Sequence, residues 1–280
     1  MNSKFIIQNS AFLQAVQCPD EEIDLGRASL TIAHAEYPDL DIGSYLARMD
    51  HLAAAVQGWA GAGADLYRLI AAINYTLFSV EGFHGNRDDY YDPKNSFLNE
   101  VMERKQGIPI TLSVLYMEVA RRVGLELQGV GFPGHFLVKH VGQEGEIVID
   151  PFHHGEVRSM EELEDMLDEL SRGKLVFQPE FLFPVSKKQI LRRMLNNLKA
   201  IYLRQADFLR SLSVVERLLI LEPNSTPEIR DRGLLYLRLE YFPQALEDLE
   251  SYIRLSSHAD DAAEIREQVM SLRKLVTQIH

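Results

Sequence analysis

The sequence predicts an α+β protein that is mostly helical, with a small antiparallel sheet in its core and a helical repeat region towards its C-terminal end. Apolar residues recur at helical spacing over most of the 280 residues. Runs typical of β-strands are short and gather in residues 125–150. A helical pattern repeats at a fixed spacing in the last part of the chain. We therefore expect a helical N-terminal cap over 1–80, a mixed core over 81–180 and helical repeats over 185–280.

The composition is that of an ordinary folded protein, with 46% hydrophobic and 25% charged residues. A net charge of −12 argues against a general affinity for nucleic-acid phosphates or anionic membranes, and it favours a basic protein partner. The single cysteine cannot form an internal disulfide. No stretch reaches the roughly 20 apolar residues of a membrane span, and residues 1–10 lack the apolar run of a signal peptide. We expect a cytoplasmic protein.

Helices are expected along the N-terminal region, where acidic residues at the first helix starts suit the helix dipole. Residues 82–96 combine Gly, Asn, Asp, Tyr and Pro without periodicity, which indicates an ordered loop. Ser96 is the expected N-cap of a short helix over 97–105. The expected helices of the cap span 12–16, 20–33, 42–59 and 65–78.

The centre of the chain predicts a buried helix followed by antiparallel strands. Pro109 suits a first helical turn, apolar residues follow it at i, i+3 and i+4 spacing, and Gly124 is the expected stop. The Gly residues after the second strand favour a tight hairpin. The expected strands lie in 125–130, 136–141 and 146–150, with the hairpin turn at Gly142–Gly145.

His135 opens one of these strands and Asp150 closes the next, fifteen residues later. In a hairpin the two side chains can meet across the strands, whereas a one-residue slip would separate them. We therefore expect a contact between His135 and Asp150. The pair has two interpretations, a general base with its orienting carboxylate or a buried polar pair satisfied for structural reasons.

The remaining sequence predicts helices. An acidic helix over 160–170 has Ser159 as its expected N-cap, with Glu162 three residues on, and 179–184 is an expected linker. The pattern around Tyr202 then recurs 34 positions later around Tyr236. A 34-residue helix-turn-helix period is typical of tetratricopeptide repeats. The repeat pair is expected to be flanked by capping helices over 187–197 and 260–279.

The order of helix, Gly, strand, His, strand and Asp-Pro resembles the core of the transglutaminase-like superfamily. The resemblance implies a papain-type triad, with a cysteine at the helix start followed by a histidine and an aspartate. His135 and Asp150 match the last two positions. Aligning the family's Gly-x-Cys with Gly107-Ile108-Pro109 puts Pro109 at the cysteine position, and the only cysteine of the chain is Cys18, far upstream.

Three motifs resemble, more narrowly, the SirB family of bacterial transglutaminase-like proteins that end in tetratricopeptide repeats. They are Phe-His-Gly-Asn-Arg-Asp-Asp-Tyr at 83–90, Asn-Ser-Phe-Leu-Asn-Glu-Val at 95–101 and Gly-Ile-Pro-Ile-Thr-Leu-Ser at 107–113. The resemblance covers nearly the whole chain. It implies a transglutaminase-like core followed by a repeat region, and by association a regulatory role in gene expression through partners.

Proline has no nucleophilic or acidic atom, so Pro109 excludes the cysteine mechanism at that position. Thr111 and Ser113 lie in the first turns of the same helix and are alternative nucleophiles that His135 could activate. The competing interpretation is that both hydroxyls serve as hydrogen-bonding groups at the helix start. We favour that second interpretation.

A metal site is a further hypothesis, because four histidines accompany Asp150. His135 and His140 are separated by an odd number of residues along a strand, so they face opposite sides of the sheet. His153 and His154 follow Asp150 in a turn and could approach it, yet adjacent histidines in a polar loop are more often solvated. We expect no metal and no cofactor.

Two other groups of residues are binding candidates. Asn86, Arg87 and Tyr90, in the 82–96 loop, are candidates to line the cleft of the core, where Arg87 offers a fixed positive charge. The competing interpretation is a loop pinned by hydrogen bonds from its Asn and Asp side chains. Basic residues of the repeat region could form a groove for an acidic peptide or only solvate the helices; they are Arg192, Arg193, Lys199, Arg204 and Arg210.

The sequence favours a non-catalytic, protein-binding or regulatory factor that holds a partner through its core cleft and its repeats. The missing nucleophile motivates this hypothesis. The rival is a hydrolase or acyltransferase in which His135 and Asp150 activate a hydroxyl or a water. The sequence leaves the oligomeric state open.

Overall fold

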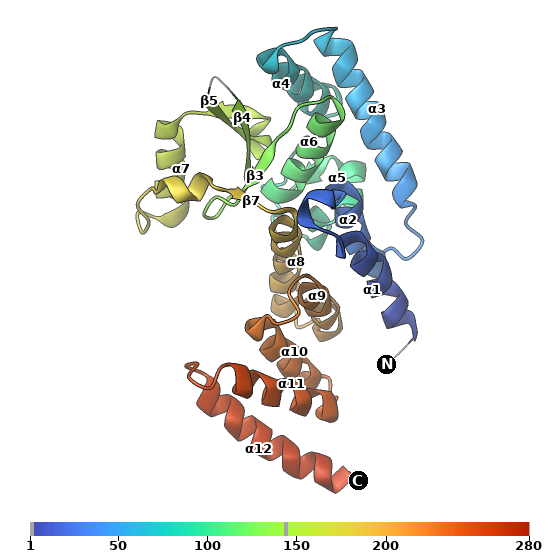
Figure 1. Ribbon diagram of the computed structural model, residues 1–280, viewed down its shortest axis with the longest axis vertical. Helices are drawn as coiled ribbons and strands as arrows, with labels where there is room; N and C mark the ends of the chain where they lie inside the picture. Colours follow the sequence, from blue (N-terminus) through green and yellow to red (C-terminus); the bar gives the residue numbers. More distant parts are fainter. Residues whose placement is uncertain (1–2, 143–144, 280) are drawn as a thin grey trace. The chain divides into compact units, whose positions relative to one another are not determined.

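The computed structural model describes residues 3–142 and 145–279 (Figure 1). The chain is mostly helical with one small antiparallel sheet, followed by a helical region, so the predicted fold class is confirmed. Contacts divide it into two compact units, Met1–Met194 and Leu195–His280. Among the described residues, no helix is long and apolar enough to cross a membrane.

Three of the four N-terminal helices begin at aspartates that act as N-caps. Asp24, Asp41 and Asp65 each accept a hydrogen bond from the backbone N–H three residues on, at 2.8–3.2 Å. The second helix therefore starts after Asp24, not at Asp20 as predicted, because residues 20–22 form a separate 3₁₀ turn. The helices are α1 (Ser3–Val16), α2 (Leu25–Ile32), α3 (Ile42–Ala60) and α4 (Leu66–Asn74), which runs on into a π-helical turn, Tyr75–Val80.

Helix α6 (Pro109–Arg122) is the centre of the first unit, as the apolar spacing predicts. It packs against α2, α3, α4, the short helix α5 (Leu98–Arg104) and strand β4. Tyr116, Val119 and Ala120 are completely buried in it. Helix α5 begins after Phe97, so Ser96 is not its N-cap as predicted; it ends a 3₁₀ turn instead.

The five-stranded sheet is antiparallel, in the order β6-β5-β4-β3-β7. The predicted hairpin is present, with Val138 opposite Ile149; of its predicted turn, residues 143 and 144 lie outside the described residues. The outer strands, β6 and β7, were not predicted, since two or three residues are too few to show a period. The strands are β3 (Gln128–Val130), β4 (Leu137–Gly142), β5 (Gly145–Asp150), β6 (Glu156–Arg158) and β7 (Pro184–Val185).

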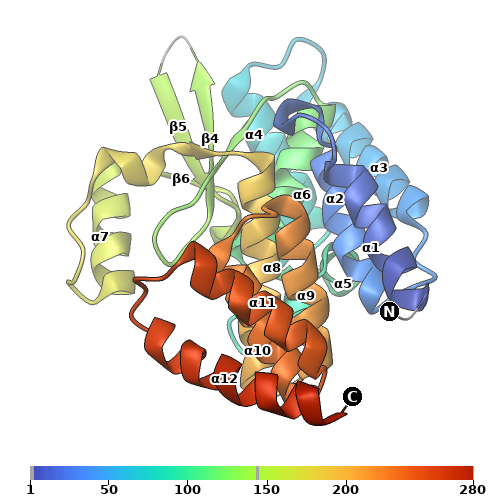
Figure 2. The same ribbon diagram turned by 60° about the horizontal axis from the view of Figure 1, so that its bottom comes forward.

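Helix α7 (Met160–Ser171) lies beside this sheet (Figure 2). Ser159 and Glu162 form the predicted capping box at its start. Its buried residues Leu163 and Leu167 pack with Leu137 and Val148 of the sheet. Elsewhere in the first unit, β1 (His84–Gly85) pairs in parallel with β2 (Gln106–Gly107), which brings the 86–95 loop to the start of α6.

The second unit consists of helix pairs with the predicted repeat. α8 (Lys187–Arg204) and α9 (Phe208–Leu221) recur as α10 (Thr226–Arg238) and α11 (Phe242–Leu255), and α12 (Ala262–Ile279) follows. The helix expected over 187–197 is continuous with the first repeat helix, and the boundary between the two units falls within α8. A buried apolar cluster holds the pairs together, including Leu212, Val215, Leu235, Ala245, Leu249 and Val269.

Candidate functional site

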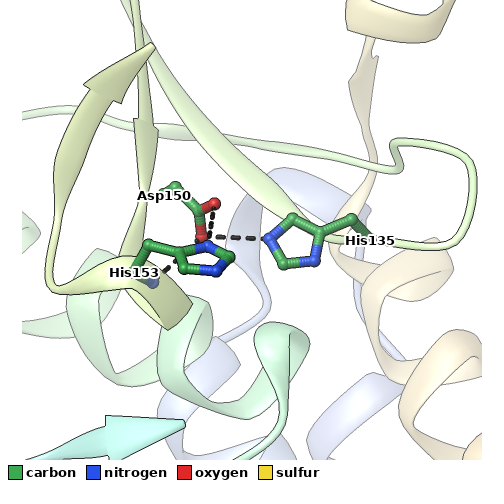
Figure 3. Close-up of side chains that lie close together, drawn as sticks. All are labelled: His135, Asp150 and His153. Carbon is green, nitrogen blue, oxygen red and sulfur yellow. Dashed lines mark hydrogen bonds and ion pairs between the residues drawn. The ribbon is translucent and has the colours of Figure 1, made fainter. Parts of the chain in front are cut away.

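The predicted contact between His135 and Asp150 is present. Nε2 of His135 lies 3.0 Å from Oδ1 of Asp150, and both residues are buried (Figure 3). His135 does not open the strand, because β4 begins two residues later at Leu137. It sits instead in a turn, where Gly134 takes a left-handed conformation with φ of +73°. That turn, rather than a cross-strand pairing, aims the imidazole at the carboxylate.

Asp150 is completely buried and fully hydrogen bonded. Its Oδ1 also accepts the backbone N–H groups of Phe152 and His153, at 3.1 and 3.3 Å, and Nη2 of Arg158 lies 3.6 Å from Oδ2. Burial by itself would raise the pKa of this carboxyl. The hydrogen bonds with His135 and His153 outweigh it and hold the pKa of Asp150 well below its usual range. The carboxylate is therefore a fixed negative charge between two imidazoles.

His153 is the second imidazole on Asp150; the sequence analysis allowed this approach but favoured a solvated loop histidine. Its Nδ1 lies 2.7 Å from Oδ2 of Asp150. Pro151–His153 forms a 3₁₀ turn capped by Asp150, which folds His153 back onto the carboxylate. The spacing Asp-Pro-x-His, with proline in the first position of a turn, was the signal that could have found it.

The other two histidines lie elsewhere. The His140 ring bonds the carbonyl of Glu126, and the His154 ring packs edge-on against Phe78. His135, Asp150 and His153 offer three ligand atoms within 4.8 Å of one another. In the described arrangement each imidazole is hydrogen bonded to the carboxylate, and the Arg158 guanidinium already provides a cation beside it.

A cleft of about 860 Å³ opens at this network. The second ring nitrogen of His135, Nδ1, points away from Asp150 and has no hydrogen-bond partner in the described part of the chain (Figure 3). Pro109 borders the same cleft as His135. The lining residues are Arg87, Tyr90, Tyr91, Pro109, Gly134, His135, Phe152, His153, Arg158, Glu162, Asp165, Met166, Glu169 and Leu170.

Thr111 and Ser113 are not placed to act as nucleophiles. Both are completely buried, and neither lines the cleft. The Thr111 hydroxyl accepts the Ile108 N–H at 3.1 Å and donates to the Asn95 carbonyl at 2.8 Å, while Ser113 donates to the Phe136 carbonyl at 3.5 Å. The geometry favours the structural interpretation, because these hydroxyls are engaged with the backbone around the start of α6.

The loop residues divide into those that line the cleft and those that support it. Asn86 is buried; its amide donates to Asn95, and its carbonyl oxygen accepts the Asp89 N–H, so it pins the loop. Arg87 and Tyr90 line the cleft, as does Tyr91. The Arg87 guanidinium lies over the Phe152 ring, 5.8 Å from its centre. Partial burial raises the pKa of Tyr90, which keeps its hydroxyl protonated.

The basic residues considered for a groove in the repeats are engaged with neighbouring groups. Arg193 belongs to the first unit, where its guanidinium donates to the carbonyls of Phe132 and His135 and so supports the turn that carries His135. Lys199 pairs with Glu228 and Asp231, each at 2.6 Å, and Arg210 pairs with Asp207 at 2.8 Å. Lys199 and Arg210 are therefore neutralised by carboxylates of the second unit.

Sequence comparison agrees with the two units. Residues 43–196 match the model of the transglutaminase-like superfamily, and residues 198–270 match a tetratricopeptide repeat model. A UPF0162 protein of Xylella fastidiosa strain Temecula1 is 38% identical over 269 residues, which cover 93% of this chain and 94% of that protein. The chain is a UPF0162 protein of the transglutaminase-like superfamily.

Other relatives of this UPF0162 protein are more distant. A UPF0162 protein of Vibrio cholerae is 31% identical over 198 residues, covering 70% of this chain and 73% of the relative. Human F-box only protein 21 is 30% identical over 188 residues, covering 63% of this chain and only 29% of the human protein. No solved structure matches the chain significantly.

Proposed function

We propose that this UPF0162 protein is a non-catalytic, protein-binding and regulatory factor that retains the cleft of a transglutaminase-like fold without its nucleophile. One observation carries the proposal. Pro109 stands in the cleft beside His135, where the resemblance expects the catalytic cysteine. None of the described residues that line the cleft is Cys, Ser, Thr or Lys. The covalent acyl-enzyme chemistry of the papain-type triad therefore has no attacking atom.

The cleft has the features of a binding surface. Tyr91 is 57% exposed and Tyr90 is 39% exposed, and both line the cleft beside Arg87. Tyrosine and arginine are the residue types that most often dominate binding energy at protein interfaces. The tetratricopeptide unit supports the same role, because such repeats generally act as protein-interaction modules. The narrower resemblance to SirB proteins also fits a factor that acts through partners.

Site-specific photo-crosslinking tests this proposal. We would replace Tyr91 by p-benzoylphenylalanine in the full chain and express this variant in the organism that naturally produces the protein, so that the natural partner is present. Tyr67 of α4 is the matched control, because it is a tyrosine with 62% exposure that does not line the cleft. The proposal predicts a discrete crosslinked polypeptide from the Tyr91 position that is absent from the Tyr67 position. The same unspecific pattern from both positions would argue against it.

A hydrolase or acyltransferase is the second candidate, and one observation favours it. His135 is held by Asp150 through Nε2 and presents Nδ1 towards the cleft, which is the arrangement of a general base with its orienting group. A water at Nδ1 could then serve as the nucleophile. This candidate requires turnover that depends on the His135 imidazole, which the binding role does not.

A further inference from the structure

Helix α7 forms one wall of the cleft, and two of its carboxylates have no ion pair among the described residues, although Arg87 and Arg158 line other parts of the same cleft. Its cleft-lining residues include Asp165 and Glu169, which lie four positions apart on the same face of the helix. In the described part of the chain, neither carboxylate has a hydrogen bond or an ion pair. Glu162, one turn earlier, differs because it bonds the Ser159 N–H and lies 3.9 Å from Arg158.

The position of these two carboxylates on the helix adds to the negative potential. Like charges four residues apart repel each other. Glu169 also lies in the last turn of α7, at the negative end of the helix dipole, where Arg172 is the C-cap residue. A cation placed against Asp165 and Glu169 would reduce the repulsion between the two carboxylates.

Apolar surface lies directly beside the two carboxylates. Met166 and Leu170 line the cleft on the same helix, and Leu170 is 45% exposed. The Leu170 side chain also lies against Gly134, since a Cβ at Gly134 would be 3.5 Å from the Cβ of Leu170. The wall thus adjoins the turn that carries His135, whose imidazole is more than nine-tenths buried and whose Nδ1 is without a partner among the described residues.

We propose that the cleft accepts an extended segment of a protein partner that carries a lysine or arginine side chain. The methylene stem of that side chain lies along Met166 and Leu170, and its cation lies against Asp165 and Glu169. A peptide group of the same segment then meets Nδ1 of His135. A long cationic side chain fits better than a small ion, because its stem covers apolar surface while its head reaches the carboxylates.

This inference rests on the proposed binding function and makes it more specific. The net charge of −12 favours a basic partner for the whole chain. We infer that Asp165 and Glu169 of α7 are the site that binds the basic side chain of the partner. Because the claim concerns charge selection, and the proposed function concerns binding as such, the two can be tested separately.

The test compares two capped peptides, Ac-Ala-Ala-Lys-Ala-Ala-NH2 and the same peptide with norleucine in place of lysine. The full chain, with its methionine methyl groups labelled with ¹³C, is titrated with each peptide, and the Met166 methyl signal is assigned with a Met166→Leu variant. We expect the lysine peptide to shift the Met166 signal and to bind roughly two- to fivefold more tightly than the norleucine peptide, the range typical of exposed ion pairs. High salt should reduce the difference.

Two double variants separate the local effect from the general charge. Asp165→Asn with Glu169→Gln should abolish the preference for lysine. Glu161→Gln with Glu164→Gln changes the net charge equally on the same helix at exposed residues that do not line the cleft, and it should leave the preference intact. Equal loss in both double variants would reduce the effect to general charge and overturn the inference.

The remaining outcomes are also decisive. If both peptides shift the Met166 signal with equal affinity, the charge selection is refuted while binding in the cleft stands. If neither peptide shifts it at millimolar concentration, the inference fails, and the crosslinking at Tyr91 decides separately whether the cleft binds a partner at all.

Discussion

Nε2 of His135 lies 3.0 Å from Oδ1 of Asp150, and the buried carboxylate binds a second imidazole, that of His153, through its other oxygen. The histidine and the aspartate that the resemblance assigns to a papain-type triad are thus in contact. The carboxylate also accepts two backbone N–H groups of the following turn. Asp150 therefore supports the local fold as well as the cleft.

Replacing Asp150 should destabilise the protein strongly. Asp150→Ala leaves two imidazoles and two backbone N–H groups without their carboxylate, so we expect the free energy of unfolding to fall by about 3–5 kcal/mol. Urea denaturation measures this free energy. The fluorescence of Trp59, the single tryptophan of the chain, reports unfolding of the first unit. Asp165→Ala, at an exposed carboxylate, is the control and should change stability by no more than about 0.5 kcal/mol. A similar loss of unfolding free energy in Asp150→Ala and Asp165→Ala would contradict the structural role of Asp150.

The depressed pKa of Asp150 predicts a specific dependence of stability on pH. A carboxyl whose folded pKa lies below its unfolded value of 3.8 stabilises the fold above that value, and this contribution is lost as pH falls towards the folded pKa. Wild-type stability should therefore decrease below about pH 4. Asp150→Asn cannot titrate, so its stability should fall less between pH 5 and pH 3. Parallel curves for the two proteins would show that Asp150 does not contribute.

The hydroxyl of Thr111 should matter for structure rather than for chemistry. Thr111→Ala leaves the Ile108 N–H and the Asn95 carbonyl without a partner in a completely buried place, at a cost of about 1–3 kcal/mol. Thr111→Ser keeps the hydroxyl and should recover most of that loss. Thermal unfolding of the two variants compares them directly. Equal losses would assign the effect to the methyl group instead.

Introducing a thiol at the start of α6 should produce a reactive cysteine. In a Cys18→Ser background, Pro109→Cys places a sulfur in the cleft with His135, at a helix N-terminus that lowers a thiol pKa. We expect alkylation by iodoacetamide at pH 7 to be at least about tenfold faster than that of Cys18 in the wild type.

His135→Ala in the same thiol variant is the control and should slow that alkylation, because the imidazole no longer stabilises the thiolate. A rate that does not respond to His135 would mean that the ring does not face Pro109. The aligned position of the missing nucleophile would then be wrong.

The sequence was sufficient for the fold class because its signals were long or strongly periodic. Helix α6, the β4–β5 hairpin, the capping box of α7 and the 34-residue repeat each rest on spacing within one segment. The contact of His135 with Asp150 was predicted from the hairpin, which brings the two segments together, but the turn at Gly134 that directs the imidazole was not predicted.

The remaining features of the site depend on contacts between distant segments or on turns of a few residues. The bond from His153 to Asp150 needs a 3₁₀ turn, and the engagement of Thr111 with Asn95 needs a loop sixteen residues away. Arg193 reaches the His135 turn from a helix that the sequence assigned to the repeats. No local period records such contacts, so only the three-dimensional structure reveals them.

The most direct test of the account is a hydrolysis and transamidation screen of the purified full chain, with amide, ester and glutamine-donor substrates, beside a folded His135→Ala variant. We predict that both proteins match the blank without protein, because none of the described residues that line the cleft is Cys, Ser, Thr or Lys. Turnover by the wild type that is lost in His135→Ala would contradict it, and would assign the cleft to an enzyme that uses His135 and Asp150 to activate water.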